Sequence, residues 1–342
     1  MDLHVFTSEI TATFMLSVGA FLLAMALTPI YTTIAYRYKF WKKQRTTSTL
    51  GDTLKVFNIL HAAKFERNIP TMAGVVGVIA IAVVTFFFNW DRAQTWLPLA
   101  ALVGGGAVGL LDDIINLRGS GKGVAGLRSS LKFAMITALA LLLGWFFYVK
   151  LGYDAIHVPF IGDWQLGIWI IPIFVFAVVA TSNAVNISDG LDGLAGGLLG
   201  ISYTTFGVIA LLQGHLMIAG FCFTVVGALL SYLWFNIYPA RFFMGDVGSF
   251  AFGTSLGVIA MLTNTLLLLP VIGILFVTEA GSSLLQIASK KLLRRKIFIS
   301  APLHQHLEAK GWPETKVTMR FWIIGCVSAF VGLLMALGGG HL

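Results

Sequence analysis

The sequence has few charged residues and almost no cysteine. Only 11% of its 342 residues are charged, and its two cysteines, Cys222 and Cys326, both lie in apolar segments. This excludes a disulfide framework and a zinc site with the usual cysteine spacing. The first dozen residues contain no lysine or arginine. Because a cleaved signal peptide begins with basic residues, we expect the first apolar segment to be retained.

The sequence also lacks a polar stretch long enough to fold as a separate soluble domain. Hydrophobic residues make up 57% of the chain, and the mean hydropathy is +0.86. A helix of roughly 20 apolar residues crosses the hydrocarbon core of a bilayer. We therefore predict an all-α polytopic membrane protein, in which residues 1–342 form one integral-membrane domain. The ten predicted spans are residues 13–36, 70–89, 97–111, 128–149, 166–185, 196–212, 216–236, 247–264, 266–288 and 319–338.

The basic residues divide unequally between the loops. Of the 23 lysines and arginines, 21 lie in loops that follow odd-numbered spans, and only Arg92 and Lys150 lie in the others. The positive-inside rule makes the basic side cytoplasmic and places both termini outside. The net charge of +8 on that face suits anionic lipid or a phosphorylated substrate rather than nucleic acid. The cytoplasmic loops are predicted at about residues 37–69, 112–132, 186–196, 236–248 and 289–319.

Two further elements are predicted between the spans. Residues 153–167 alternate apolar and polar side chains and include Pro159 and Gly162, which is typical of a short external β-hairpin. Residues 289–298, after the ninth span, combine a basic face with an apolar face. This pattern predicts an amphipathic helix in the plane of the membrane interface.

Five acidic residues form three groups at the cytoplasmic ends of different spans. Asp112 and Asp113 end the third span, Asp189 and Asp192 lie between the fifth and sixth, and Asp246 opens the eighth. Any one group alone is explained equally well as a solvated helix cap. Acids are costly near a bilayer, however, and three groups at one depth, surrounded by glycines, indicate a shared site.

The spacing within each group indicates its geometry. Asp112 and Asp113 are adjacent, so on a helix their side chains point about 100° apart and should have different roles. Asp189 and Asp192 are three residues apart. They share one face of a helix if a helix begins there, with Ser188 as its N-cap.

Clustered carboxylates with open coordination positions suit Mg²⁺, which binds one or two carboxylates together with substrate phosphates. Basic side chains in the same loops would neutralise those phosphates during phosphoryl transfer. His304 and His306 add ionisable groups from the last cytoplasmic loop, and Glu279, deeper in the ninth span, fits a structural hydrogen-bonding role. The basic candidates are Lys64, Arg67, Arg118, Lys122 and Lys132.

Five segments of the chain resemble a known group of enzymes. They are PTMAG (70–74), GLLDD (109–113), NAVNISDGLDGLAGG (183–197), FNIYPARFFMGDVGS (235–249) and APLHQHLEAKGWPETKVTMRFW (301–322). Together they resemble the polyprenyl-phosphate N-acetylhexosamine-1-phosphate transferase superfamily over nearly the whole chain. The last segment resembles its phospho-N-acetylmuramoyl-pentapeptide transferase branch in particular.

This resemblance implies a multi-pass enzyme of the bacterial inner membrane with its active site on the cytoplasmic face. Its reaction would transfer phospho-N-acetylmuramoyl-pentapeptide from the UDP-linked donor to undecaprenyl phosphate, which gives lipid I and UMP for peptidoglycan synthesis. The cofactor would be Mg²⁺, and the family suggests a homodimer.

The resemblance also implies roles for individual residues. Catalytic roles fall to Asp112, Asp113, Asp189 and His304, and Mg²⁺ binding falls to Asp246 and Asp189. The substrate-binding residues would be Asn186, Asp192, Asn236, Phe243 (against uracil), Lys132, His306 and Lys64.

The chain departs from the family pattern at two positions. Gln305 stands where the family has the middle of three histidines, so we expect His304 to carry the histidine function. Asn116 stands where a lysine usually follows the aspartate pair. We therefore expect Arg118 or Lys122 to meet the phosphate charge instead.

Two other functions remain open from the sequence. The first is a UDP-N-acetylglucosamine–polyprenyl-phosphate N-acetylglucosamine-1-phosphate transferase of the same superfamily. The second is a membrane transporter. Transporters place ionisable residues near the bilayer midplane and often have repeated halves, whereas here the acids lie at one surface and no internal repeat is evident.

Overall fold

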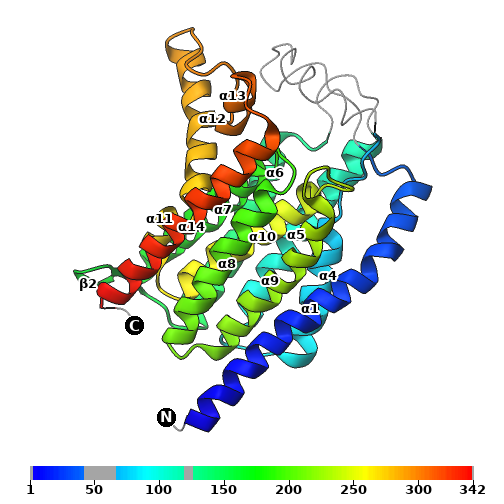
Figure 1. Ribbon diagram of the computed structural model, residues 1–342. Coiled ribbons are helices and arrows are strands. Elements are labelled where there is room, and N and C mark those ends of the chain that lie inside the picture. Colours follow the sequence, from blue (N-terminus) through cyan, green and yellow to red (C-terminus); the bar gives the residue numbers. More distant parts are fainter. Residues whose placement is uncertain (1–2, 42–66, 119–125, 341–342) are drawn as a thin grey trace.

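The computed structural model describes residues 3–41, 67–118 and 126–340, which form a bundle of long helices with one small hairpin (Figure 1). In chain order the elements are α1 (Leu3–Arg37), α4 (Gly74–Phe88), α5 (Trp96–Arg118), α6 (Ser129–Val149), β1 (Ala155–Val158), β2 (Gly162–Gln165), η1 (Gly167–Trp169), α7 (Ile170–Ser188), α8 (Leu194–Leu212), α9 (Leu216–Asn236), α10 (Gly245–Leu262), η2 (Leu266–Leu268), α11 (Leu269–Ile272), α12 (Ile274–Leu292), α13 (Leu303–Ala309) and α14 (Glu314–Gly338).

The helices match the predicted spans in position. Within the described part of the chain, eight helices are long and apolar enough to cross a membrane. A ninth candidate is the broken pair of residues 266–272 and 274–292, and α4 is a shorter apolar helix of 15 residues. The protein is therefore a multi-pass helical membrane protein, as predicted.

One predicted span is not straight. The chain turns by 81° between residues 266–272 and α12, so a single helix over residues 266–288 is wrong. Gly273 ends α11, and its backbone N–H caps the carbonyl of Leu269. Hydropathy measures how apolar a segment is but carries no information about its direction, so this bend was not predicted.

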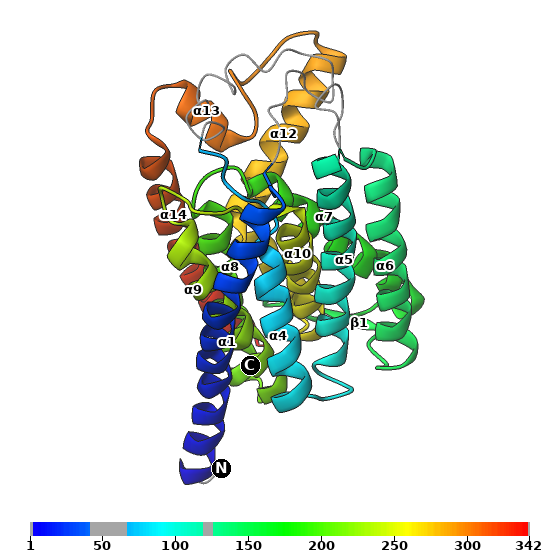
Figure 2. The same ribbon diagram turned by 90° about the vertical axis from the view of Figure 1, so that its right-hand side faces the viewer.

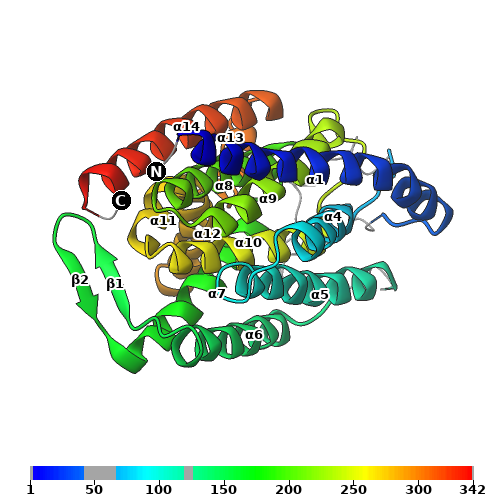
Figure 3. The same cartoon turned by 90° about the horizontal axis from the view of Figure 1, so that it is seen from below.

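The helix α10 forms the centre of the bundle. Every residue of α10 except Asp246 is buried. Helices α5 and α7 pack along it, with α4 and α8 also in contact, and Figure 3 shows α10 enclosed by these neighbours. Asp246 is thus the one partly accessible residue on the innermost helix, at the end where α10 begins.

Helices α5 and α10 approach each other very closely at this end. A Cβ atom at Gly109 of α5 would overlap the backbone carbonyl of Asp246. Gly109 therefore permits a backbone contact that a side chain would prevent. Since Asp112 follows Gly109 by one turn, this contact places Asp112 beside the start of α10.

The predicted hairpin is confirmed. Strands β1 and β2 pair antiparallel, with Ala155 opposite Gln165. His157 joins the hairpin to the end of α14, because its two ring nitrogens lie 2.8 Å from Asp163 Oδ1 and 3.0 Å from the carbonyl of Gly339. The hairpin and both ends of the chain lie at the end of the bundle away from α13 (Figure 1).

The predicted amphipathic helix over residues 289–298 is wrong. Its first residues form the last turns of α12, and residues 293–302 are irregular. The side-chain oxygen of Gln286 accepts hydrogen bonds from the backbone N–H groups of Ile297 and Phe298, which fixes the returning chain without a helix. Figure 2 shows α12 and α13 extending beyond the other helices at the end of the bundle opposite the N-terminus.

Candidate active site

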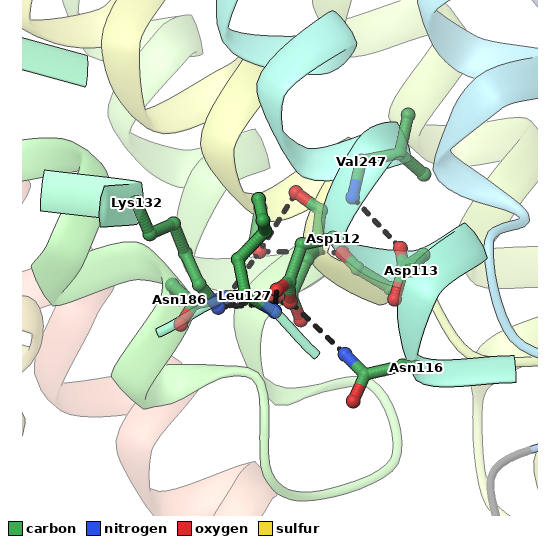
Figure 4. Close-up of polar contacts among 10 residues, drawn as sticks. Asp112, Asp113, Asn116, Leu127, Lys132, Asn186 and Val247 are labelled. Atoms are coloured by element: carbon green, nitrogen blue, oxygen red, sulfur yellow. Dashed lines mark hydrogen bonds and ion pairs between the residues drawn. The ribbon is translucent and has the colours of Figure 1, made fainter. Parts of the chain in front are cut away.

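One lysine joins the acids of two helices. The Nζ atom of Lys132, in the first turn of α6, lies 2.9 Å from Oδ2 of Asp112 and 2.8 Å from Oδ2 of Asp246 (Figure 4). The side chain of Asp112 is 2% exposed, that of Asp246 is 15% exposed and that of Lys132 is 20% exposed. A cation is therefore held between two carboxylates at the rim of the bundle.

Asp112 makes two further contacts. Its Oδ2 accepts a hydrogen bond from Asn116 Nδ2 at 3.0 Å, and its Oδ1 accepts one from the backbone N–H of Leu127 at 2.7 Å. Asn116, the residue that departs from the family pattern, thus helps to orient this carboxylate. The phosphate contact expected for Arg118 or Lys122 stays a prediction. Arg118 is exposed at the end of α5, and Lys122 lies outside the described residues.

Asp113 points to a different partner, as predicted from its position on the helix. Its Oδ2 accepts a hydrogen bond from the backbone N–H of Val247 at 3.0 Å (Figure 4). Val247 is in the first turn of α10, where backbone N–H groups lack helical partners and a negative charge is favourable. Asp113 therefore fixes α10 against α5 while Asp112 faces Lys132.

Helix α7 joins the same region through Asn186. The amide Nδ2 of Asn186 donates a hydrogen bond to Ser249 Oγ of α10 at 2.8 Å. Asp189 ends α7 one turn later as its C-cap and is partly buried. The third acidic group thus reaches the end of the bundle at which α10 begins.

The prediction that Asp189 and Asp192 share one helical face is wrong. Residues 189–193 form a turn, and α8 begins only at Leu194, after Gly193 with φ of 78°. That left-handed conformation suits glycine and prevents a continuous helix. Ser188 is the last residue of α7 rather than an N-cap, and its hydroxyl donates to the carbonyl of Ala184.

Asp192 and Asn236 connect this turn to its neighbours. Asp192 Oδ2 accepts a hydrogen bond from the N–H of Ala240, and Glu314 Oε1 accepts one from the N–H of Asp192 at 2.6 Å. Asn236 accepts from the N–H of Gly193 and donates to the carbonyl of Phe242. Both side chains are buried and hold the loops after α7 and α9 together. Their predicted contact with a nucleoside stays a prediction.

The two phenylalanines of the loop before α10 differ in environment. Phe242 is buried, with its ring against those of Tyr31 and Phe235. Phe243 is only partly buried, and its backbone N–H donates to the carbonyl of Pro70. Phe242 therefore packs within the bundle, and the predicted contact of Phe243 with uracil stays a prediction.

The predicted histidines have separate surroundings. His304 is 1% exposed, and both its backbone N–H and its ring Nδ1 bind the carboxylate of Glu279, at 3.0 and 2.7 Å. The ring lies against Gly190, directly after Asp189. The last loop therefore reaches the acidic region through His304.

His306 lies on the other side of the short helix α13. Its Nδ1 accepts a hydrogen bond from the N–H of Ile299, and its ring meets Phe298 edge to face. Desolvation and the charge of Lys310 lower the pKa of His306. Gln305 accepts a hydrogen bond from Ser300 at 2.9 Å. Both side chains thus order the chain between α12 and α13.

Known proteins are similar to this chain over most of its length. Residues 95–264 match glycosyl transferase family 4. The phospho-N-acetylmuramoyl-pentapeptide-transferase of Chloroflexus aurantiacus is 38% identical over 97% of this chain and 92% of its own length. Those of Levilactobacillus brevis and Thermodesulfovibrio yellowstonii are 41% and 38% identical, covering 80% and 79% of this chain and 85% and 80% of their own. The chain belongs to the phospho-N-acetylmuramoyl-pentapeptide transferase family.

The match to glycosyl transferase family 4 runs from the start of α5 to just after α10. It therefore includes Asp112, Lys132, Asp189 and Asp246, and the contacts among α5, α6 and α10 fall wholly within it. Lys64, the remaining predicted substrate-binding residue of this transferase, lies outside the described residues.

A metal site in this transferase would need additional ligands from the substrate. Among residues 3–41, 67–118 and 126–340, no group of three or more His, Cys, Asp and Glu side chains is arranged to hold a metal ion. Mg²⁺ commonly binds to one or two carboxylates and completes its shell with substrate phosphates and water. Asp112 and Asp246 fit that requirement, since their Oδ2 atoms already share one cation, Lys132 Nζ.

Several residues that build the site were not singled out from the sequence. They are Leu127, Ser249 and Glu314, which contribute a backbone N–H, a hydroxyl and a carboxylate. Leu127 has no local signal, whereas Ser249 and Glu314 lie within the motif segments 235–249 and 301–322, which gave no information about their distant partners. Glu279 did carry a signal, since an acid within an apolar helix indicates a function or a specific partner.

Proposed function

We propose that this transferase moves phospho-N-acetylmuramoyl-pentapeptide from its UDP-linked donor to undecaprenyl phosphate in peptidoglycan synthesis. A phosphate oxygen of the lipid attacks the sugar-linked phosphorus of the donor. A new P–O bond forms, the bond to UMP breaks, and lipid I remains in the membrane. The observation that carries the proposal is the 38% identity to a protein of that name over 97% of this chain.

The position of the site supports this reaction. Asp112, Lys132 and Asp246 meet at the end of an apolar bundle. There a water-soluble nucleotide can reach the head group of a lipid whose chain stays in the bilayer. The lysines and arginines of the described chain gather at this same end, with Arg92 and Lys150 the exceptions. We infer from the positive-inside rule that this end faces the cytoplasm of a bacterial inner membrane.

The residues of the site suggest a division of work. Bound Mg²⁺, held by Asp246 with Asp112 or Asp189, would neutralise charge on the pyrophosphate. Lys132 can bind a phosphate oxygen in place of its present carboxylate partners, because its Nζ lies at the accessible rim. The lipid phosphate is already largely ionised near neutral pH. Asp112 therefore serves mainly to position charge rather than to remove a proton.

The deciding experiment measures UMP release from purified protein with undecaprenyl phosphate and one nucleotide sugar at a time. We expect Mg²⁺-dependent release with UDP-N-acetylmuramoyl-pentapeptide and little with UDP-N-acetylglucosamine. Release with UDP-N-acetylglucosamine alone would assign the protein to the other branch of the superfamily. No release with either donor, together with uptake of solute by proteoliposomes, would indicate a transporter.

A further inference from the structure

Glu279 and His304 form a pair with almost no solvent access. Glu279 is 0% exposed and His304 is 1% exposed. Oε1 of the carboxylate accepts the backbone N–H of His304 at 3.0 Å, and Oε2 lies 2.7 Å from Nδ1 of the ring. One carboxylate therefore fixes both the backbone and the ring of the same residue. Glu279 lies on the long helix α12, which fixes the position of the carboxylate that orients the His304 ring.

Contact with an ionised carboxylate selects the ring nitrogen that carries the proton. An ionised carboxylate can only accept hydrogen bonds, so Nδ1 must be protonated to satisfy Oε2. In the neutral imidazole, Nε2 then carries a lone pair and is an acceptor. A carboxylate that fixes a histidine tautomer in this way is a common device for orienting functional imidazoles.

The free nitrogen points at the turn after α7. Among the described residues, Nε2 of His304 is buried and has no hydrogen-bond partner. It lies so close to Gly190 that a Cβ there would collide with it, while Gly190 itself is exposed. Leaving a buried polar atom unsatisfied costs about 1–3 kcal/mol. The fold therefore holds an unsatisfied acceptor directly beneath the turn that carries Asp189.

We propose that Glu279 is a positioning residue of the transfer reaction. It acts through His304 by presenting the Nε2 lone pair to the Asp189–Gly190 turn, as an acceptor that a hydroxyl or amide donor of the substrate reaches when this exposed turn moves. This inference rests on the proposed function and adds to it a residue outside the acidic cluster. It requires a particular tautomer of His304, which a purely structural hydrogen bond would not.

The substitution Glu279→Gln tests this requirement. The backbone N–H of His304 can only donate, so the oxygen of the introduced amide must face it, and the amide NH₂ must then face Nδ1. Both hydrogen bonds survive, but the proton moves to Nε2, which becomes a donor. We expect unchanged thermal stability and a fall in kcat/KM of about tenfold or more. In the double variant with His304→Ala, we expect no loss beyond that of His304→Ala alone.

Nitrogen NMR of protein labelled with ¹⁵N-histidine identifies the tautomer of His304 and does not depend on enzyme activity. The His304 signals are assigned by their absence from His304→Ala. We expect an unprotonated Nε2 in the wild type and a protonated Nε2 in Glu279→Gln. Three results would each overturn the proposal. The first is a protonated Nε2 in the wild type, and the second is full activity of Glu279→Gln with the tautomer reversed. The third is a double variant in which the activity losses of the two single substitutions add. If the wild type has no transferase activity, the proposed function fails, while the NMR result still stands.

The substitution Gly190→Ala is a second test that leaves Glu279 in place. The backbone of Gly190 is not left-handed, so alanine is allowed there, but its Cβ would displace the His304 ring. The control is Gly281→Ala on α12, where a Cβ would meet nothing within 4 Å. We expect turnover to fall with Gly190→Ala and to persist with Gly281→Ala. Normal turnover of Gly190→Ala would contradict the proposal even if Glu279→Gln does not fold.

Discussion

Lys132 is the side chain on which the geometry of the acidic site depends. Its Nζ lies within 3 Å of oxygens from two helices, and its removal would leave Asp112 and Asp246 facing each other. Two carboxylates that share a site repel each other unless a cation or a proton lies between them. A divalent cation would satisfy the same need, so a metal ion bound there would compete with Lys132 for one position.

Replacing Lys132 tests this competition. Lys132→Gln removes the positive charge and keeps much of the side-chain volume. We expect the affinity for Mn²⁺, measured by electron paramagnetic resonance in the absence of substrate, to rise severalfold. We also expect UMP release to fall, because the positive charge proposed to bind the substrate phosphate is lost. Unchanged Mn²⁺ binding would show that the metal does not bind between these carboxylates.

The adjacent acids Asp112 and Asp113 should differ in their effects. Asp112→Asn removes the charge that faces Lys132, and we expect it to abolish most UMP release. Asp113→Asn weakens the bond to the start of α10. A hydrogen bond to a charged group is worth about 1.5–3 kcal/mol, so we expect Asp113→Asn to lower the temperature of thermal unfolding in detergent while it keeps more UMP release than Asp112→Asn. A smaller loss of UMP release in Asp112→Asn than in Asp113→Asn would contradict the roles assigned to the two residues.

The sequence predicted which residues would matter better than it predicted their partners. The divergence of Asp112 and Asp113 follows from helix geometry alone and is confirmed. The bond from Lys132 to Asp246 joins residues 114 positions apart and needs the packing of α6 against the bundle. The shared helical face of Asp189 and Asp192 was wrong because the conformation of Gly193 outweighed the spacing of the two acids.

At the scale of helices, the contact between α5 and α10 fixes the site. Gly109 allows the two backbones to meet, and Asp112 and Asp113 follow it on the same helix. Asp113 then binds the start of α10, and Asp112 shares Lys132 with Asp246. The short segment GLLDD therefore supplies both the close approach and the two carboxylates that use it.

A methyl group at Gly109 should disturb this arrangement. Gly109→Ala forces α5 away from the carbonyl of Asp246, and overpacking of this kind costs about 1–3 kcal/mol. We expect a lower unfolding temperature in detergent and a loss of UMP release. The matched control is Gly19→Ala on α1, where a Cβ would meet nothing within 4 Å. Equal stability of the two variants would show that the α5–α10 contact is looser than described.

The segment between α12 and α13 should loosen in acid. The pKa of His306 is lower in the folded protein than in the unfolded chain, so folding favours the neutral ring. The stability that His306 contributes is present above its unfolded pKa of about 6.5 and is lost as the pH falls through the folded value. Protonated Nδ1 cannot accept the N–H of Ile299.

Hydrogen exchange of residues 293–303, corrected for intrinsic rates, measures this effect. We expect the protection of Ile299 to fall between pH 7.5 and pH 5.5 in the wild type. His306→Asn places an amide oxygen near the position of Nδ1 and does not titrate, so its protection should change less. The same loss in His306→Asn would contradict a role for His306 in this pH dependence.

The sequence predicted the positions of the helices because apolar runs are long and separated by polar loops. It did not predict the 81° bend at Gly273 or the irregular chain after α12. Both depend on how one segment packs on another. The hairpin at residues 155–165 was predicted because its alternation and its turn residues are local signals.

In the described part of the molecule, the acids of α5, α7 and α10 gather at one end of an apolar bundle, and the two ends of the chain lie toward the other (Figure 1). This asymmetry fits an enzyme that joins an aqueous donor to a lipid acceptor at one surface of a membrane. It fits a transporter poorly, because the acids of α5 and α10 lie at a helix end rather than at mid-depth. The homodimer implied by the resemblance stays a prediction, to be measured by light scattering with correction for bound detergent.

The central claim is that Asp112 and Asp246, from two different helices, act in one catalytic site. Its most direct test is transfer of labelled phospho-N-acetylmuramoyl-pentapeptide to undecaprenyl phosphate by the wild type and by Asp246→Asn at saturating Mg²⁺. We predict product with the wild type, and at least a hundredfold less, as an order of magnitude, with a folded Asp246→Asn variant. Wild-type rates of product formation by Asp246→Asn would contradict the account.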